Sequence, residues 1–191
     1  MSKFKLSSIV IAIAVVLLTT AFVVFDNPCG GKERWDVKTL TDTAVSRINF
    51  KPKSVTIERL IQTVPGRKIG NNTPRFGLEF NVCTVICKIR EYRTEDDGDK
   101  HLVLVSTVDS TVTMIGEIPN LMCDTTNSNK FRPKFDSCLA EFKKYTLKNY
   151  KVKPGKYKVT GVIFYDKIHG QLGVAPNGIE LHPILSIKKV K

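Results

Sequence analysis

The sequence lacks the short motifs that usually identify a chemistry. It contains no CxxC pair, which argues against a zinc site built from cysteines, and neither an HExxH metal-binding pattern nor a GxSxG nucleophile motif. It also has no internal repeat and no long helical periodicity, which excludes a repeat protein and a coiled coil. The sequence therefore assigns no specific reaction.

What is present describes one domain of ordinary size. The chain has 191 residues, enough for a single domain with a short appendage and too few for two well-buried domains. Apolar residues make up 42% and charged residues 25%, with 12 Gly and 9 Pro. This composition fits neither a disordered polymer nor a fibrous repeat.

The N-terminal segment predicts export. Residues 1–25 carry Lys3 and Lys5, which are followed by the uncharged stretch Leu6–Phe25. As a helix this stretch would span about 30 Å, the thickness of a hydrocarbon core, and it is longer than the apolar region of a typical cleaved signal. An uncleaved membrane anchor and a signal peptide both remain open, and a buried core helix is the less favoured alternative. Both an anchor and a signal peptide would place the rest of the chain outside the cytoplasm, because Lys3 and Lys5 keep the N-terminus on the cytoplasmic side.

Cysteine usage agrees with export. The chain has 5 Cys, and in an exported protein these are more often structural than metal-binding. Cys83 and Cys87 share one face of a strand-like segment about 13 Å apart, so they cannot pair with each other. Cys123 and Cys138 flank a polar loop and would close a short ring around it. We predict this disulfide, whose closure contributes about 3 kcal/mol by chain entropy.

Alternation of apolar and polar residues, with turn residues between the runs, predicts five strands and one helix. A bulge is expected where the parity changes within the first strand, and Pro183 argues for a sheet edge or a bulge in the last one. A short additional helix is expected from Thr41 or Asp42 through Ile48. The expected strands are residues 77–94, 101–106, 111–118, 157–165 and 179–187, and the expected main helix is 136–147.

The order strand, strand, strand, helix, strand, strand matches the OB-fold, a mainly β, five-stranded Greek-key barrel. We therefore predict an OB-like barrel domain at 77–191, preceded by an N-terminal arm at 26–76 and the apolar helix of residues 1–25. A β-sandwich with the same strands paired differently is the alternative, because the order of elements does not fix their pairing.

Four segments resemble a known family. They are ERWDVKTLTD at 33–42, EDDGDKHLVL at 95–104, TMIGEIPNLMC at 113–123 and HGQLGVAPNGIELHPILSI at 169–187. Together they resemble a family of uncharacterised bacterial exported proteins with an ERWxVKTxTD motif near the N-terminus and an HGQxGVAPNGIELHP motif near the C-terminus. The extra cysteines of this chain depart from that pattern. The resemblance implies a single exported domain and supplies no mechanism.

Polar residues gather in the loops that an OB barrel brings to its binding face. These loops join strands one and two, and strands four and five. Here they carry EDDGDKH and HGQLGVAPNG. Histidine and carboxylate side chains are good ligands for a divalent metal, and a carboxylate can act as a general base. The candidate ligand-binding rim consists of Asp97, Asp99, His101, Glu117, His169, Gln171, Asn177 and His182.

Three interpretations of this rim remain open: bracing of the loops, ligand binding without chemistry, and a metal-dependent hydrolase. Asp97 and Asp99 also suit any hairpin turn, since Asx side chains bond their own backbone. Asn177 could cap the loop, and His182 could brace the strand at Pro183. The hydrolase requires histidines and carboxylates around an open position. Catalytic residues and cofactor are not assigned by the sequence.

Positive charge is the second candidate feature. Lys and Arg number 30 against 18 Asp and Glu, a net charge of +12. This excess favours an anionic polymer or lipid surface as partner, and the predominance of lysine argues against sequence-specific reading of nucleic acid. The sequence thus predicts an exported protein of the bacterial envelope with a binding or structural role, and a metal-dependent hydrolase as the alternative. The densest cations are Lys130, Arg132, Lys134, Lys143, Lys144, Lys148, Lys151, Lys153, Lys156 and Lys158.

Overall fold

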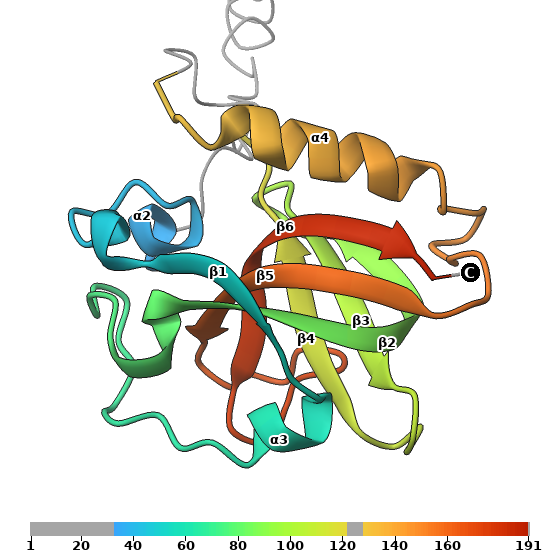
Figure 1. Ribbon diagram of the computed structural model, residues 1–191, viewed down its shortest axis with the longest axis horizontal. Helices are drawn as coiled ribbons and strands as arrows, with labels where there is room; N and C mark the ends of the chain where they lie inside the picture. The colour runs from blue at the N-terminus through green and yellow to red at the C-terminus, as the bar shows by residue number, and fades with distance from the viewer. Residues whose placement is uncertain (1–32, 122–127, 191) are drawn as a thin grey trace, which may run out of the picture.

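Five strands close into a barrel, and a sixth strand, β1 (Asn49–Ser54), lies outside it. The computed structural model describes residues 33–121 and 128–190. Around the barrel the order is β2-β3-β4-β6-β5, and β2 pairs with β5 to close it (Figure 1). The barrel strands are β2 (Asn81–Thr94), β3 (Lys100–Ser106), β4 (Thr113–Ile118), β5 (Tyr157–Tyr165) and β6 (Ile179–Lys189).

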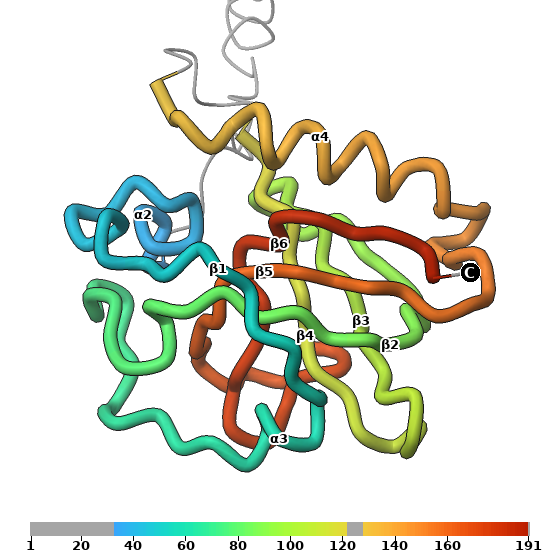
Figure 2. The backbone as a smooth tube through the Cα atoms, viewed as in Figure 1, coloured from blue at the N-terminus to red at the C-terminus, as the bar shows by residue number. Residues whose placement is uncertain are grey.

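The strand pairing confirms the predicted OB-like Greek-key barrel. Strands β2, β3 and β4 form an antiparallel meander, β4 and β6 run parallel, and β6 is antiparallel to β5. The remaining pair, β2 with β5, is antiparallel and completes the circle, and Figure 2 shows the chain wrapping around one interior. A sandwich would need two separate facing sheets, and this closure excludes it.

Strand β2 serves two barrel neighbours because it bends. Its residues from Val82 to Cys87 pair with β5, and those from Cys87 to Thr94 pair with β3. The register shifts between Ile89 and Tyr92, which confirms the bulge predicted from the change of parity. A bulge inserts an unpaired residue and turns the strand, as a small barrel requires.

Pro183 lies at a bulge and not at a sheet edge. The edge prediction is wrong because β6 lies between β4 and β5. The bulge prediction is confirmed, since the β5–β6 register shifts on both sides of Gly161. A bulge interrupts the ladder where proline has no N–H to donate. The His182–Pro183 peptide is cis.

Helix α4 joins β4 to β5 as predicted and lies along β6 (Figure 1). It runs over Arg132–Lys143 and so begins and ends one turn earlier than predicted. Pro133 fits in the first turn of α4, because a backbone N–H at that position would have no intrahelical partner and proline therefore loses no hydrogen bond. The other helical elements are α2 (Trp35–Lys38), α3 (Ile57–Ile61) and two 3-10 turns, η1 (Val45–Arg47) and η2 (Gly77–Phe80).

The predicted helix from Thr41 or Asp42 to Ile48 is wrong, because only the short turn η1 forms there. Asp42 does accept a hydrogen bond from the backbone N–H of Ala44 at 3.1 Å, as a cap would. The Asp42 carboxylate also forms a buried ion pair with Arg75, in which Arg75 Nη2 lies 2.8 Å from Asp42 Oδ2. Tertiary contact therefore replaces local helix formation in this segment.

A second buried ion pair fixes the N-terminal arm to the barrel. Arg34 binds Glu79 through two hydrogen bonds, with Nη1–Oε1 at 2.9 Å and Nη2–Oε2 at 2.6 Å. Both residues also bond the backbone of Tyr165 in β5: Arg34 donates to its carbonyl, and Glu79 accepts from its N–H. Loss of one partner from such a buried pair costs about 3–5 kcal/mol, so the arm is an integral part of the fold.

The arm also covers a second apolar cluster. The larger cluster fills the barrel interior, whereas the smaller one lies between the arm, the start of α4 and the outer face of the barrel. Trp35 and Phe131 pack at its margin. The buried members of the smaller cluster are Leu40, Ile48, Val82, Leu121, Phe135, Val162 and Leu185.

Among residues 33–121 and 128–190, no helix is long and apolar enough to cross a membrane. The predicted anchor or signal at 6–25 lies outside these residues. Cys83, Cys87 and Cys138 are buried free thiols, and no disulfide joins the described cysteines. Cys123, the predicted partner of Cys138, lies outside the described residues, so that pairing stays a prediction.

We predict that these three thiols are inert until the protein unfolds. Burial raises the pKa of each to about 12, so at pH 8 only about one thiol in ten thousand is ionised. Iodoacetamide should leave Cys83, Cys87 and Cys138 unmodified in the native chain and label Cys83 and Cys87 in guanidinium chloride without reductant, as read by peptide mass spectrometry. Cys138 tests the predicted disulfide: labelling of Cys138 only after reduction would demonstrate the bond, and labelling without reductant would exclude it.

We predict that Gly161→Ala destabilises the barrel by about 1–3 kcal/mol, the usual cost of overpacking. A Cβ at this position would lie 2.9 Å from both the Leu181 Cβ and the Pro183 carbonyl oxygen. Neither atom is the end of a flexible side chain, so the backbone of β6 would have to move to relieve the clash. Gly66→Ala is the matched control, because its added Cβ meets open space. Urea unfolding should give a lower free energy for the first variant alone, and equal values would contradict the packing.

Candidate functional site

Four of the eight rim residues come together, from three strands and one turn. Asp99 ends the β2–β3 turn, His101 lies on β3 directly opposite Glu117 of β4, and His182 lies on β6. The parallel pairing of β4 with β6 sets Gly116 beside Leu181, which brings His182 next to Glu117. The barrel topology therefore assembles one cluster from segments that are far apart in the sequence.

His101 is held on both sides by acceptors. Its Nδ1 lies 3.0 Å from Glu117 Oε1 and its Nε2 lies 2.9 Å from the Leu172 carbonyl oxygen. A carboxylate and a carbonyl both accept, so the two contacts are satisfied together only when both ring nitrogens carry protons. Burial opposes this charge, but the bonds to Glu117 and Leu172 outweigh it and raise the pKa of His101.

His182 lies fully buried among three carboxyl groups. Its Nδ1 lies 3.0 Å from Glu117 Oε2 and 3.8 Å from Glu180 Oε1, and its Nε2 lies 3.4 Å from Asp99 Oδ2. None of these approaches has hydrogen-bond geometry, so both ring nitrogens are buried without a bonded partner. Phe164 packs against the ring with centroids 5.6 Å apart.

Asp99 and Glu117 each use one oxygen for support and direct the other at His182. Asp99 Oδ1 accepts the backbone N–H of Asn120 at 2.6 Å, whereas its Oδ2 has no hydrogen bond. Glu117 Oε1 accepts from His101, whereas its Oε2 faces His182. The supporting bonds fix the orientation of both carboxylates.

The surroundings separate the pKa values of two neighbouring carboxyl groups. Burial and the charge of Glu117 raise the pKa of Glu180 to about 7. Burial acts on Glu117 in the same direction, but the attraction of His182 and the bond from His101 outweigh it and lower the pKa of Glu117. Glu117 is therefore the ionised group, whereas Glu180 gains and loses its proton near neutral pH.

Sequence analysis missed two members of this neighbourhood, Lys38 and Glu180. Lys38 reaches over from α2, with Nζ 3.6 Å from Asp166 Oδ2. Burial disfavours its charge, but the attraction of Asp166, followed by that of the cluster carboxylates, raises the pKa of Lys38. Lys38 lies in ERWDVKTLTD and Glu180 in GIELHP, so the segments that resemble the exported family carried the available signal.

The other four rim residues lie outside the cluster and shape loops. Asp97 accepts the backbone N–H of Asp99 within the turn at 3.1 Å. Gln171 bonds the backbone of His169 and Lys167, and His169 itself is exposed. Asn177 donates to the carbonyls of α3 and the segment after it, which braces the loop against that helix.

A second candidate site is a groove of about 370 Å³ on the outer face of the barrel. Three exposed lysines from three elements border it, Lys134 of α4, Lys158 of β5 and Lys188 of β6. The hydroxyls of Thr84 and Thr160, 2.7 Å apart, belong to the lining. The residues that line the groove are Phe50, Pro52, Ser54, Val82, Thr84, Lys134, Lys158, Thr160, Leu185, Ser186 and Lys188.

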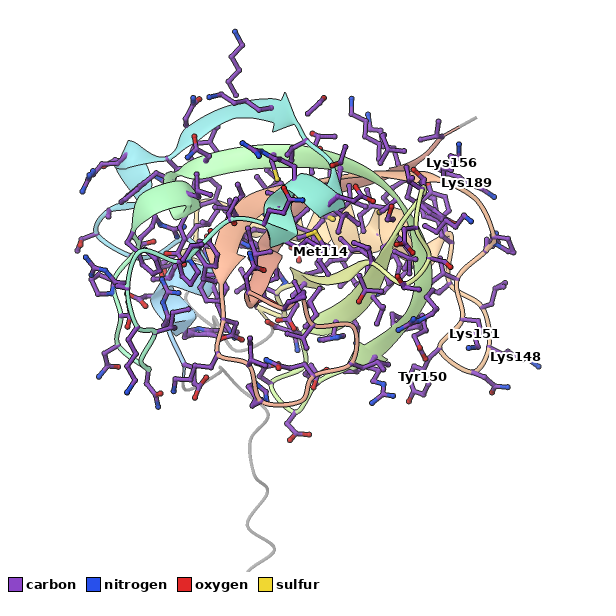
Figure 3. The ribbon with its side chains drawn as sticks, turned by 90° about the horizontal axis from the view of Figure 1, so that it is seen from below. Met114, Lys148, Tyr150, Lys151, Lys156 and Lys189 are labelled. Carbon is purple, nitrogen blue, oxygen red and sulfur yellow. The ribbon has the colours of Figure 1, made fainter. Side chains whose placement is uncertain are left out.

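The groove separates the dense cations of the sequence into two groups. Lys134 and Lys158 line it, with no Asp or Glu among the lining residues. Figure 3 shows Lys148, Tyr150 and Lys151 gathered at the turn beyond α4, and these residues do not line the groove. Only a part of the basic segment is thus built into a concave surface.

We predict that Asn177→Ala lowers the free energy of unfolding by about 1–3 kcal/mol, because it removes the side-chain hydrogen bonds that tie this loop to α3 and to the segment after it. Asn177 Nδ2 lies 3.0 Å from the Leu60 carbonyl oxygen and 2.7 Å from that of Thr63, and Oδ1 accepts from Ile179. His169→Ala should change stability by no more than about 0.5 kcal/mol, since its side chain is exposed. Urea unfolding of both variants measures this, and a larger loss for His169→Ala would refute the placement.

Comparison with known proteins assigns no family. No protein-family model matches the chain, and no curated protein matches it. The functional argument therefore depends on the buried cluster and the basic groove.

Proposed function

We propose that this protein is an exported binding protein of the bacterial envelope whose ligand is an anionic polymer. The single observation that supports this function best is the basic groove, where three lysines surround a floor with hydroxyl groups and no carboxylate lines the surface. Lysines supply mobile positive charge and hydroxyls supply hydrogen bonds, a combination suited to a repeating anionic unit. The proposed role is binding alone and includes no catalysed reaction.

The shape of the groove favours a polymer over a lipid surface. Its lining comes from five elements, β1, β2, β5, β6 and α4, which together form one concave surface. The flat surface of a lipid bilayer would contact only the edges of the groove. One unit of an anionic polymer fits within its volume of about 370 Å³. Phe50 stacks on Phe131 with centroids 5.4 Å apart and contributes an apolar wall.

Export and membrane tethering of the chain are inferred from its sequence alone. The charge-free stretch Leu6–Phe25 after Lys3 and Lys5 supports translocation of the barrel, and a retained helix would hold it at the membrane. The net charge of +12 would then concentrate anionic envelope polymers around the groove.

A metal-dependent hydrolase is the second candidate, favoured by the convergence of Asp99, Glu117 and His182. The burial of these side chains weighs against it. Asp99 and His182 are 0% exposed, and both ring nitrogens of His101 are engaged. Among the described residues the cluster presents no open position to a polymeric substrate, so the groove supports the stronger proposal.

We predict that replacing Lys134, Lys158 and Lys188 together by Ala weakens binding of dextran sulfate by about threefold to a hundredfold. Each exposed charge pair contributes about 0.2–1 kcal/mol, and about 1.4 kcal/mol corresponds to a factor of ten. The full chain in mild detergent is titrated against the labelled polymer, with fluorescence anisotropy as readout. Affinity should also fall steeply with added salt.

The matched control replaces Lys148, Lys151 and Lys156, three exposed lysines outside the groove, by Ala. It changes the net charge by the same amount, so an affinity within about twofold of the parent protein is expected if the groove is the site. Equal losses in both triple variants would mean that diffuse charge binds the polymer and would overturn the proposed site.

A further inference from the structure

The buried cluster has the donor set of a metal site. Asp99, Glu117 and His182 each offer one ligand atom, and these atoms all lie within 4.8 Å of one another. Bonds from a first-row divalent ion to oxygen or nitrogen are about 2.0–2.2 Å, so donors around a tetrahedral ion lie about 3.3–3.6 Å apart. Side-chain adjustments of about an ångström would bring the three donors to that separation.

Unpartnered atoms at the centre of the cluster point to a missing ligand. Among residues 33–121 and 128–190, four buried side-chain atoms lack hydrogen bonds, and all belong to His182 or to carboxyl groups that face its ring. Buried polar groups are nearly always bonded, and an exception calls for an ion or a water. A cation bound to one nitrogen of the ring and to the carboxylate oxygens that face it would supply a part of the missing interactions. The four atoms are Asp99 Oδ2, Glu180 Oε1, His182 Nδ1 and His182 Nε2.

The supporting contacts have the form expected around metal ligands. Carboxylates and imidazoles that bind metals are usually fixed by hydrogen bonds from neighbouring groups. Asp99 Oδ1 receives the Asn120 N–H and Glu117 Oε1 is bonded to His101, and each leaves its second oxygen directed toward His182. The free oxygens are therefore oriented before any ion arrives.

Carboxyl groups dominate the immediate surroundings of His182. Asp99, Glu117 and Glu180 surround His182, and the permanent cation nearby, Lys38, is closest to a different carboxylate, Asp166, at 3.6 Å. A nitrogen donor with two carboxylates suits a first-row ion such as Zn²⁺, whereas Ca²⁺ requires six to eight oxygen ligands.

We propose that Asp99, Glu117 and His182 bind one first-row divalent cation, with Zn²⁺ as the best-suited ion, in a structural site that ties the β2–β3 turn to β4 and β6. Glu180 is positioned to act as a further oxygen ligand. The site is independent of the anionic ligand, because its donors and the lysine groove share no residue.

The test uses the full chain in mild detergent, stripped with EDTA and dialysed. Addition of Zn²⁺ should restore about one ion per chain by elemental analysis and raise Tm by about 5–10 °C at a hundredfold excess over Kd. Ca²⁺ at the same concentration should leave Tm unchanged. Absence of both Zn²⁺ uptake and a Tm shift in the parent protein would overturn the proposal.

Variants assign the ligands. His182→Gln and Glu117→Gln should abolish the stoichiometric Zn²⁺, whereas His169→Ala should retain it, because His169 is exposed and outside the cluster. The triple lysine variant of the groove should also retain the metal, so that failure of one proposal is distinguishable from failure of the other. Unchanged Zn²⁺ content in His182→Gln would refute the assignment.

A measurement on the parent protein covers the case in which the cluster variants do not fold. Co²⁺ substitutes for Zn²⁺ and reports its coordination through visible d–d absorption. Saturation of this absorption at one equivalent, reversed by Zn²⁺, is the expected result. A spectrum identical to that of Co²⁺ in buffer would refute a protein-bound ion.

Discussion

The bend of β2 is the constraint on which the rest of the structure depends. One strand pairs with β5 through its first half and with β3 through its second, and the register shift between Ile89 and Tyr92 lets it do both. Without that bend the sheet would stay open between β2 and β5, because the pairing of these two strands closes it. Closure completes the barrel in which the parallel pair of β4 and β6 sets Glu117 beside His182.

The N-terminal arm then supplies what a bare barrel lacks. Two buried ion pairs, Arg34 with Glu79 and Arg75 with Asp42, fix the arm where it covers apolar surface. Such pairs compensate the cost of burying charge only when their remaining hydrogen bonds are satisfied, and here the backbone carbonyls of Tyr165, Glu79 and Val37 satisfy the guanidinium groups. The same arm carries Lys38 to the cluster and β1 to the groove, so both candidate sites depend on it.

The sequence predicted what local patterns can encode. Alternation and turn residues revealed all five barrel strands, and their order led to the OB-like barrel and to a rim of eight residues. Four of the eight, Asp99, His101, Glu117 and His182, come together in the structure. The sequence analysis missed strand β1 because its residues are all exposed, so no buried apolar face marks it; pairing with β2 and the stacking of Phe50 on Phe131 hold it in place. The groove lysines come from three elements, and Lys38 lies in the arm, far from Asp99 along the chain. Only tertiary structure brings such residues together, which is also why His169 could not be told from its buried counterparts.

The position of β1 has a consequence for self-association. Within residues 33–121 and 128–190, β2 is the only strand that pairs with β1. A free strand edge is a template on which strands of other copies can assemble, and proteins protect such edges with proline and lysine. Here Pro52 offers no N–H, and Lys51 and Lys53 flank it. The wall of the groove is therefore built from a strand whose own residues oppose growth into an aggregate, so the chain can present a binding surface beside an exposed edge without recruiting further copies to it.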